Sequence, residues 1–139
     1  MNVRKVAVAG TGMMGPGIAA TYALGGCEVT MVSRTAENAA KGVASVKSLL
    51  GVLAEHGLAE PAAVRSAGER VTASTSPEEA ARAAQLFVES IQESLPIKQE
   101  YFARLDAAAP DTILCSNTSG ISITEIAARC KKPERVLTT

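Results

Sequence analysis

The chain has 139 residues, a length that ordinarily forms one domain around one core. Its 14 Lys and Arg residues balance 14 Asp and Glu residues, so there is no general attraction for nucleic acid or anionic lipid. No stretch approaches the roughly 20 apolar residues that span a bilayer. The first apolar run meets glycine too early for a signal peptide. We therefore expect a cytoplasmic protein without nucleic-acid or membrane partners.

Strands and helices alternate along the first half of the chain. Val3–Ala9 is short, rich in Val and Ala and followed by glycine, which indicates a buried strand. Pro16–Leu24 is expected to form a helix that ends at the next two glycines. Glu28–Val32 predicts a second strand, and Ala36–His56 predicts a long helix with an apolar stripe at helical spacing.

The second half continues the alternation. Ser76–Glu79 and Ser122–Glu125 have the pattern of capping boxes, which predicts a short helix after the first and a helix that reaches Lys131 after the second. Pro96–Leu105 predicts another helix between them. Short apolar runs predict further strands at Val71–Ala73, Leu86–Val88, Ile113–Cys115 and Val136–Thr138.

This order of elements predicts an α/β fold, a Rossmann-type doubly wound parallel sheet with helices on both faces. Thr139 directly follows an expected core strand, whereas domain boundaries usually lie in exposed linkers. We therefore expect the sheet domain to lack its C-terminal part.

A glycine loop follows the first strand. Gly10-Thr11-Gly12-Met13-Met14-Gly15 fits GxGxxG and leads into a helix, which is the context that the dinucleotide-binding motif requires. Gly10 permits the tight turn, Gly12 lets the backbone approach a pyrophosphate, and Gly15 allows close packing of the helix. The amides at the start of the helix favour the phosphates. The alternative is a plain glycine turn.

Ser33 and Arg34 stand where the second strand ends. NAD-preferring sites usually carry Asp or Glu there, about 20 residues beyond the motif, to bind the ribose 2′-hydroxyl. A hydroxyl and a guanidinium would instead bind the 2′-phosphate of NADP. We therefore expect an NAD(P) site that favours NADP. Alternatively, Arg34 is a solvated turn residue or stacks on adenine, and Ser33 only caps the next helix.

The cysteines and the histidine predict no metal site. Cys27, Cys115 and Cys130 have no CxxC spacing and lie in or beside expected core elements, which is typical of buried thiols. His56 is the single histidine and lies at an expected helix end.

The glycine loop and two further segments together carry a family resemblance. Gly10–Ala19, Glu89–Lys98 and Ser116–Ser119 resemble, in order and spacing, the GxGxMGxGIA, ExxxExxxxK and SNTS motifs of the 3-hydroxyacyl-CoA dehydrogenases. The resemblance covers essentially the whole chain and corresponds to the NAD-binding domain of that family. It implies an oxidoreductase of fatty acid metabolism that interconverts 3-hydroxyacyl-CoA and 3-ketoacyl-CoA by hydride transfer.

The resemblance also implies roles for single residues. Glu93 and Lys98 would lie on the ribose and nicotinamide side of the cofactor, and Asn117 would also bind the cofactor. Ser119 would be catalytic, because its hydroxyl would bind the 3-oxygen of the substrate. Without the resemblance, Glu93 and Lys98 are most simply a solvated pair at a helix start, and Ser119 is an ordinary loop hydroxyl.

This chain differs from the family in two respects. The family usually has aspartate where Ser33 stands, which weakens the expectation of NAD. Its catalytic histidine would follow Thr139, and so would the helical domain that completes the acyl-CoA pocket and forms the homodimer. We therefore interpret residues 1–139 as an incomplete dinucleotide-binding domain that is inactive alone.

Three alternatives stay open. A relative acting on another small β-hydroxy acid, such as a sugar acid or carnitine, would use the same first domain. A non-catalytic module would bind the dinucleotide without chemistry. A binding module without any nucleotide is the third, and the glycine loop argues against it.

Overall fold

The computed structural model describes residues 2–139 and contains one parallel sheet. The strands are β1 (Lys5–Ala9), β2 (Glu28–Val32), β3 (Val71–Ser74), β4 (Leu86–Glu89), β5 (Ile113–Ser116) and β6 (Val136–Thr138). The helices are α1 (Met14–Leu24), α2 (Ala36–Glu55), α3 (Pro61–Glu69), α4 (Pro77–Ala83), α5 (Leu95–Ala108) and α6 (Ile123–Ile126), with 3-10 turns η1 (Ala127–Arg129) and η2 (Pro133–Arg135). The expected α/β class is confirmed.

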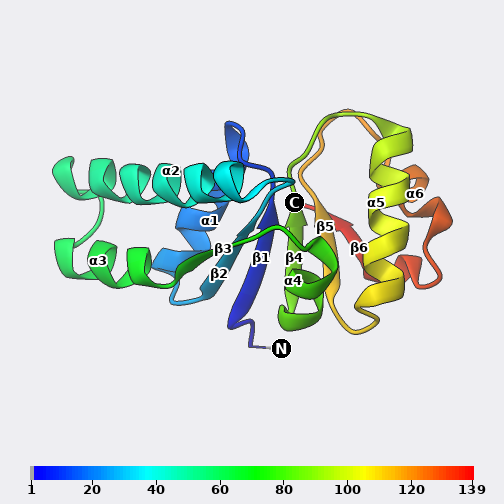
Figure 1. The fold of residues 1–139 in the computed structure, drawn as a ribbon, viewed down its shortest axis with the longest axis horizontal. Helices are drawn as coiled ribbons and strands as arrows, with labels where there is room; N and C mark the ends of the chain where they lie inside the picture. The colour runs from blue at the N-terminus through cyan, green and yellow to red at the C-terminus, as the bar shows by residue number, and fades with distance from the viewer. Residues whose placement is uncertain (1) are drawn as a thin grey trace.

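Helices cover both faces of the six-stranded sheet, so the chain is doubly wound (Figure 1). One buried cluster lies between the sheet and α1, α2 and α3, and a second lies under α4, α5 and α6. In the first cluster Ala19, Ala20 and Ala23 form the contact face of α1, and such small residues allow close approach to the strands. In the second cluster Phe87 and Phe102 supply the bulk.

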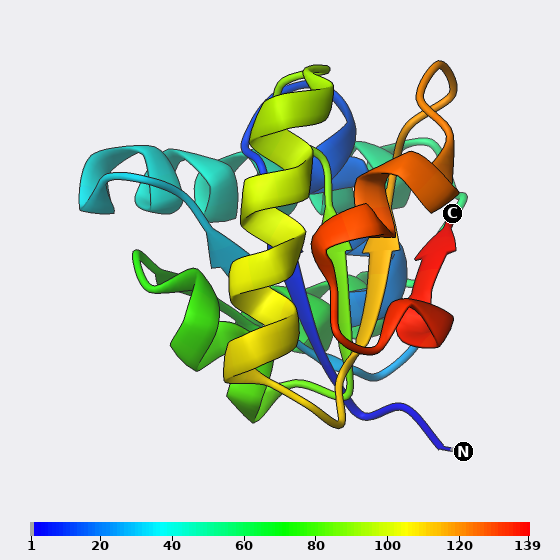
Figure 2. The same ribbon diagram turned by 90° about the vertical axis from the view of Figure 1, so that its right-hand side faces the viewer.

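The strand order, β3-β2-β1-β4-β5-β6, is that of a dinucleotide-binding sheet. β1 pairs with β2 on one side and with β4 on the other, so the order reverses between β1 and β4. All neighbouring strands are parallel, so their carboxyl ends meet at one edge, as the arrows of β5 and β6 show in Figure 2. The loops after β1, β2, β4 and β5 leave that edge.

Local signals account for most helix ends. The Thr35 hydroxyl accepts from the amide of Asn38 at 3.2 Å and caps α2. Ser76 accepts from the amide of Glu79 at 3.4 Å and caps α4, as expected. α1 and α2 are followed by Gly26 and Gly57, whose φ angles of 90° and 67° allow the chain to turn back.

The last expected helix is wrong in length and in its cap. The side chain of Ser122 makes no capping hydrogen bond, α6 has one turn, and a 3-10 turn follows it. Asp106 on α5 holds the chain that follows the 3-10 turn, because its carboxylate accepts from the amide of Lys131 at 2.6 Å and also binds Arg135. The helical run stops before this contact, at Cys130, where the backbone is extended.

Candidate dinucleotide site

The glycine loop is held by two close backbone contacts. Gly10 has a φ of 108°, and a Cβ there would lie 2.1 Å from the carbonyl oxygen of Ser90. A Cβ on Gly15 would lie 1.9 Å from the carbonyl oxygen of Gly10. The turn therefore requires glycine at both positions, because any side chain would displace backbone.

Gly12 differs from its neighbours because a Cβ there would meet nothing within 4 Å. It is exposed at the beginning of α1, next to Met13 and Met14, which are 93% and 54% exposed. Within the described residues, no side chain caps the N-terminus of α1, whereas α2 and α4 are capped. Open space in front of uncapped helix amides suits the phosphates of a dinucleotide.

A cavity of about 720 Å³ extends from this loop across the neighbouring strand ends. Its volume is within the usual range for small-molecule sites. The glycine loop contributes Gly10, Thr11 and Gly12, and the loop after β2 contributes Ser33 and Arg34. The remaining polar and aromatic lining comes from Asn38, Thr75, Ser90, Gln92, Tyr101 and Arg104.

The charged side chains that line the cavity are Arg34 and Arg104. Arg104 binds Glu78, and although burial opposes ionisation of that carboxyl, its own backbone amide and Arg104 hold its pKa below the usual value. Arg34 is exposed at the end of β2. Thr35, not Ser33, caps α2, so the interpretation of Ser33 as a helix cap is wrong.

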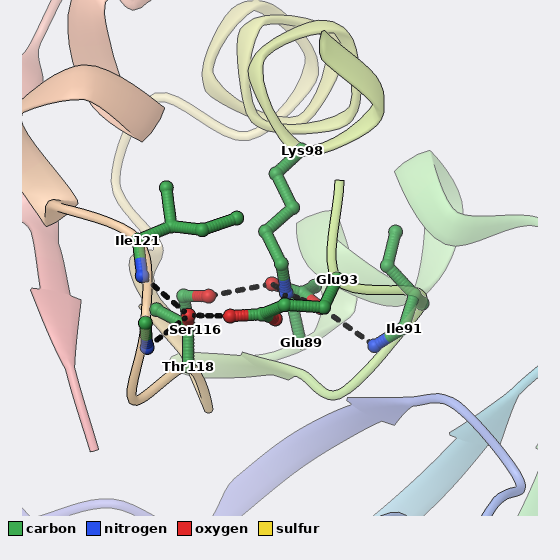
Figure 3. A network of polar contacts seen from close by, with 8 residues as sticks. Glu89, Ile91, Glu93, Lys98, Ser116, Thr118 and Ile121 are labelled. Atoms are coloured by element: carbon green, nitrogen blue, oxygen red, sulfur yellow. Dashed lines mark hydrogen bonds and ion pairs between the residues drawn. The ribbon is translucent and has the colours of Figure 1, made fainter. Parts of the chain in front are cut away.

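A buried ion pair lies beyond the cavity, at the carboxyl end of β4. Glu89 and Lys98 are both 0% exposed, and the Lys98 Nζ donates to the Glu89 Oε1 and Oε2 at 2.7 and 2.8 Å. Ser116 on β5 donates its hydroxyl to the same carboxylate at 2.6 Å. The amide of Ile91 donates at 2.6 Å as well. These bonds join β4, β5 and α5 at one point (Figure 3).

Glu93 and Thr118 connect the loop after β4 with the loop after β5, next to the Glu89–Lys98 pair. Their side chains point toward each other in Figure 3, and the Thr118 hydroxyl donates to Glu93. Thr118 also accepts from the amides of Gly120 and Ile121 at 3.4 and 3.2 Å, which fixes the loop after β5. The pKa of Glu93 is lowered, mainly by the hydrogen bond from Thr118 and to a smaller extent by the hydrogen bond from Lys98.

The residues to which the family resemblance gives roles lie at different depths in the structure. Lys98 is fully enclosed, with Glu93 3.3 Å away, so the interpretation of a solvated pair is wrong. Glu93 keeps 48% of its side chain exposed, and Ser119 is exposed on the loop that Thr118 fixes. Asn117 donates its backbone amide to the Glu89 carbonyl at 2.7 Å. All four residues lie outside the lining of the large cavity.

Several lining residues stand at positions that no motif specifies. Asn38, Thr75, Gln92, Tyr101 and Arg104 come from four separate segments. They meet because β2, β3 and β4 end at the same edge of the sheet, and the strand order that brings them together is a long-range property. Their positions after consecutive strands are the one signal that points to them.

Other site types find little support among residues 2–139. No three His, Cys, Asp or Glu side chains of this part are grouped to hold a metal. Its helices are all too short or too polar to cross a membrane. Cys27 and Cys115 are buried, and burial raises the pKa of Cys115 to about 11, which disfavours the reactive thiolate.

Comparisons with known proteins agree with this geometry. Residues 5–139 match the family model described as 3-hydroxyacyl-CoA dehydrogenase, NAD binding domain. A probable 3-hydroxybutyryl-CoA dehydrogenase of Bacillus subtilis is 41% identical over 138 residues, which are 99% of this chain and 48% of that protein. The L-carnitine dehydrogenase of Streptomyces griseus is 35% identical over 98% of this chain and 40% of its own length.

A solved structure has the same fold. The crystal structure of 3-hydroxybutyryl-CoA dehydrogenase from Escherichia coli K12 superimposes with a TM-score of 0.92 at 36% identity, covering 99% of this chain and 29% of that chain. This chain thus spans about half or less of the length of the relatives it matches.

Proposed function

Since the chain belongs to the 3-hydroxyacyl-CoA dehydrogenase family through its NAD-binding domain, we propose that it is the cofactor-binding part of an enzyme that interconverts 3-hydroxyacyl-CoA and 3-ketoacyl-CoA. The observation that carries this proposal is the glycine loop. Gly12 leaves open space before the uncapped start of α1, at the point where the strand order reverses. Such crevices bind dinucleotides in open α/β sheets.

The residues of the site divide along the cofactor. Gly10, Gly12 and Gly15, with Met13 and Met14, form the loop that receives the pyrophosphate. Ser33 and Arg34, at the end of β2, receive the adenosine end of the dinucleotide. β2 and β4 lie on opposite sides of β1, and the nicotinamide half extends toward β4. Glu93 and Asn117 face the nicotinamide side, and Lys98 acts there through Glu93.

The bound cofactor supplies the hydride acceptor or donor. Ser119 donates its hydroxyl to the 3-oxygen of the substrate, from a loop that Thr118 holds in place. A general base is also needed. His56 does not supply it, because it is exposed at the end of α2 and lies outside the cavity lining. We therefore expect residues 1–139 alone to bind cofactor without turning over substrate.

We also propose a preference for NADP. Arg34 and Arg104 are the charged side chains of the lining, and carboxylates that would repel a 2′-phosphate are not among the described lining residues. Charge-assisted hydrogen bonds to phosphate are stronger than neutral ones.

Arg34→Ala tests this preference. We expect the variant to bind NADPH about 10- to 100-fold more weakly, since one hydrogen bond to a charged group contributes about 1.5–3 kcal/mol. NADH affinity should stay unchanged. Calorimetric titration of both dinucleotides at fixed salt measures the effect, with Arg129→Ala, an exposed arginine outside the cavity lining, as the control. Stronger binding of NADH by the unchanged chain would contradict the preference.

A second candidate substrate rests on the likeness to L-carnitine dehydrogenase. Carnitine is also a β-hydroxy acid, and Ser119 would contact only its hydroxyl. Rates of the intact enzyme with 3-hydroxybutyryl-CoA and with carnitine distinguish the two substrates. The homodimer and the cytoplasmic location stay predictions.

A further inference from the structure

We infer that Glu93 is a specificity-determining residue that favours the oxidised over the reduced dinucleotide, because it is the unbalanced carboxylate of the cluster with Glu89 and Lys98. This inference rests on the proposed dinucleotide site. It goes further in assigning a redox-dependent part of the binding free energy to one side chain.

The cluster holds two carboxylates and one ammonium. Lys98 is 0% exposed and donates to both oxygens of Glu89, so these two charges balance each other inside the protein. Glu93 lies 3.3 Å from the same ammonium, and the Thr118 hydroxyl that donates to it carries no charge. One negative charge is therefore left over, and it lies on the partly exposed side chain.

That charge lies next to the cofactor cavity. Glu93 follows Ser90, Ile91 and Gln92, which all line the cavity in the loop after β4. A dinucleotide with its adenosine end near Ser33 and its pyrophosphate at the glycine loop has to extend toward β4 and β5. The nicotinamide half therefore approaches the loops that Glu93 and Thr118 connect.

The two redox forms differ by one charge at this end. The oxidised nicotinamide ring carries one positive charge, and addition of a hydride to the ring makes it neutral. A fixed carboxylate in a cleft attracts the charged form more strongly than the neutral form. The adenosine half is identical in both forms, so the ratio of their Kd values cancels its contribution.

Titrations of NAD⁺ and NADH at low ionic strength test the inference. Glu93→Gln should weaken binding of NAD⁺ relative to NADH by a factor of about 3 to 10, the scale expected for one partly screened charge. Glu28→Gln is the matched control, because it makes the same change of charge on the exposed amino end of β2. It should leave the ratio unchanged.

Two further variants separate charge from shape. Glu93→Ala removes the same charge without adding an amide, so it must shift the ratio in the same direction. Thr118→Val removes the hydrogen bond and keeps the charge, so the ratio should stay near that of the unchanged chain.

The outcomes are distinct. Equal changes for both redox forms in Glu93→Gln, or a shift in Thr118→Val as large as in Glu93→Gln, would overturn the inference and leave the dinucleotide site intact. Failure of the unchanged chain to bind either form would overturn the proposed function itself.

Discussion

Lys98→Met is expected to lower the free energy of unfolding by about 3–5 kcal/mol, because it leaves a buried carboxylate without its cation. Glu89 is 0% exposed, and Lys98 donates to both of its oxygens. The hydroxyl of Ser116 and the amide of Ile91 would remain as partners, but neither carries charge. Chemical denaturation followed by circular dichroism measures the loss.

An exposed ion pair provides the control. Lys5 and Glu28 lie 3.6 Å apart with more than half of each side chain exposed, so Lys5→Met should cost no more than about 1 kcal/mol. Adding Glu89→Gln to Lys98→Met should restore part of the stability, since it removes the unpaired charge. Equal losses in Lys98→Met and Lys5→Met would show that the buried pair contributes little.

Gly12→Val is expected to weaken dinucleotide binding about 10- to 100-fold and to leave the fold intact. The new side chain would meet no protein atom within 4 Å, so it would occupy the space that the pyrophosphate needs. Forcing extra atoms into a filled space costs about 1–3 kcal/mol, which corresponds to that loss of affinity. Titration gives the affinity, and thermal unfolding confirms the fold.

Two other glycines give the comparison. Gly51→Val on α2 also meets nothing within 4 Å, yet it lies outside the cavity lining, so binding should persist. Gly15→Val should prevent folding, because its side chain would collide with the backbone of Gly10. Undiminished binding in a folded Gly12→Val variant would refute the assignment of the loop.

Local patterns predict most of this sheet. Most strands are short and mainly apolar, and β1 is buried along Val6–Ala9, as the sequence indicates. β3 is the weaker case, because Val71 is its one buried residue within the described chain. α2 matches its apolar stripe, with Val46 and Leu50 buried. α3 was not predicted in this way, because it has nine residues and Ala67 is the one residue of it that is buried, so it carries no long apolar run.

The candidate site was predictable to a similar degree. The glycine loop follows from sequence because its backbone geometry demands glycine. The enclosure of Lys98 did not follow, because a lysine at a helix start is usually solvated. Its burial depends on Glu89, nine positions earlier, which faces it only after α5 packs on β4 and β5.

The central position of β1 has a consequence for the order of folding. β1 and β2 pair locally, whereas the joining of β1 to β4 brings together residues such as Lys5 and Gln85, which are 80 positions apart. Closing so long a loop is slow relative to local pairing. The glycine loop rests on Ser90 and therefore takes its final shape only after β4 has docked. On a ribosome, cofactor binding would therefore have to wait for β4 and could not begin with the first strand, helix and strand alone.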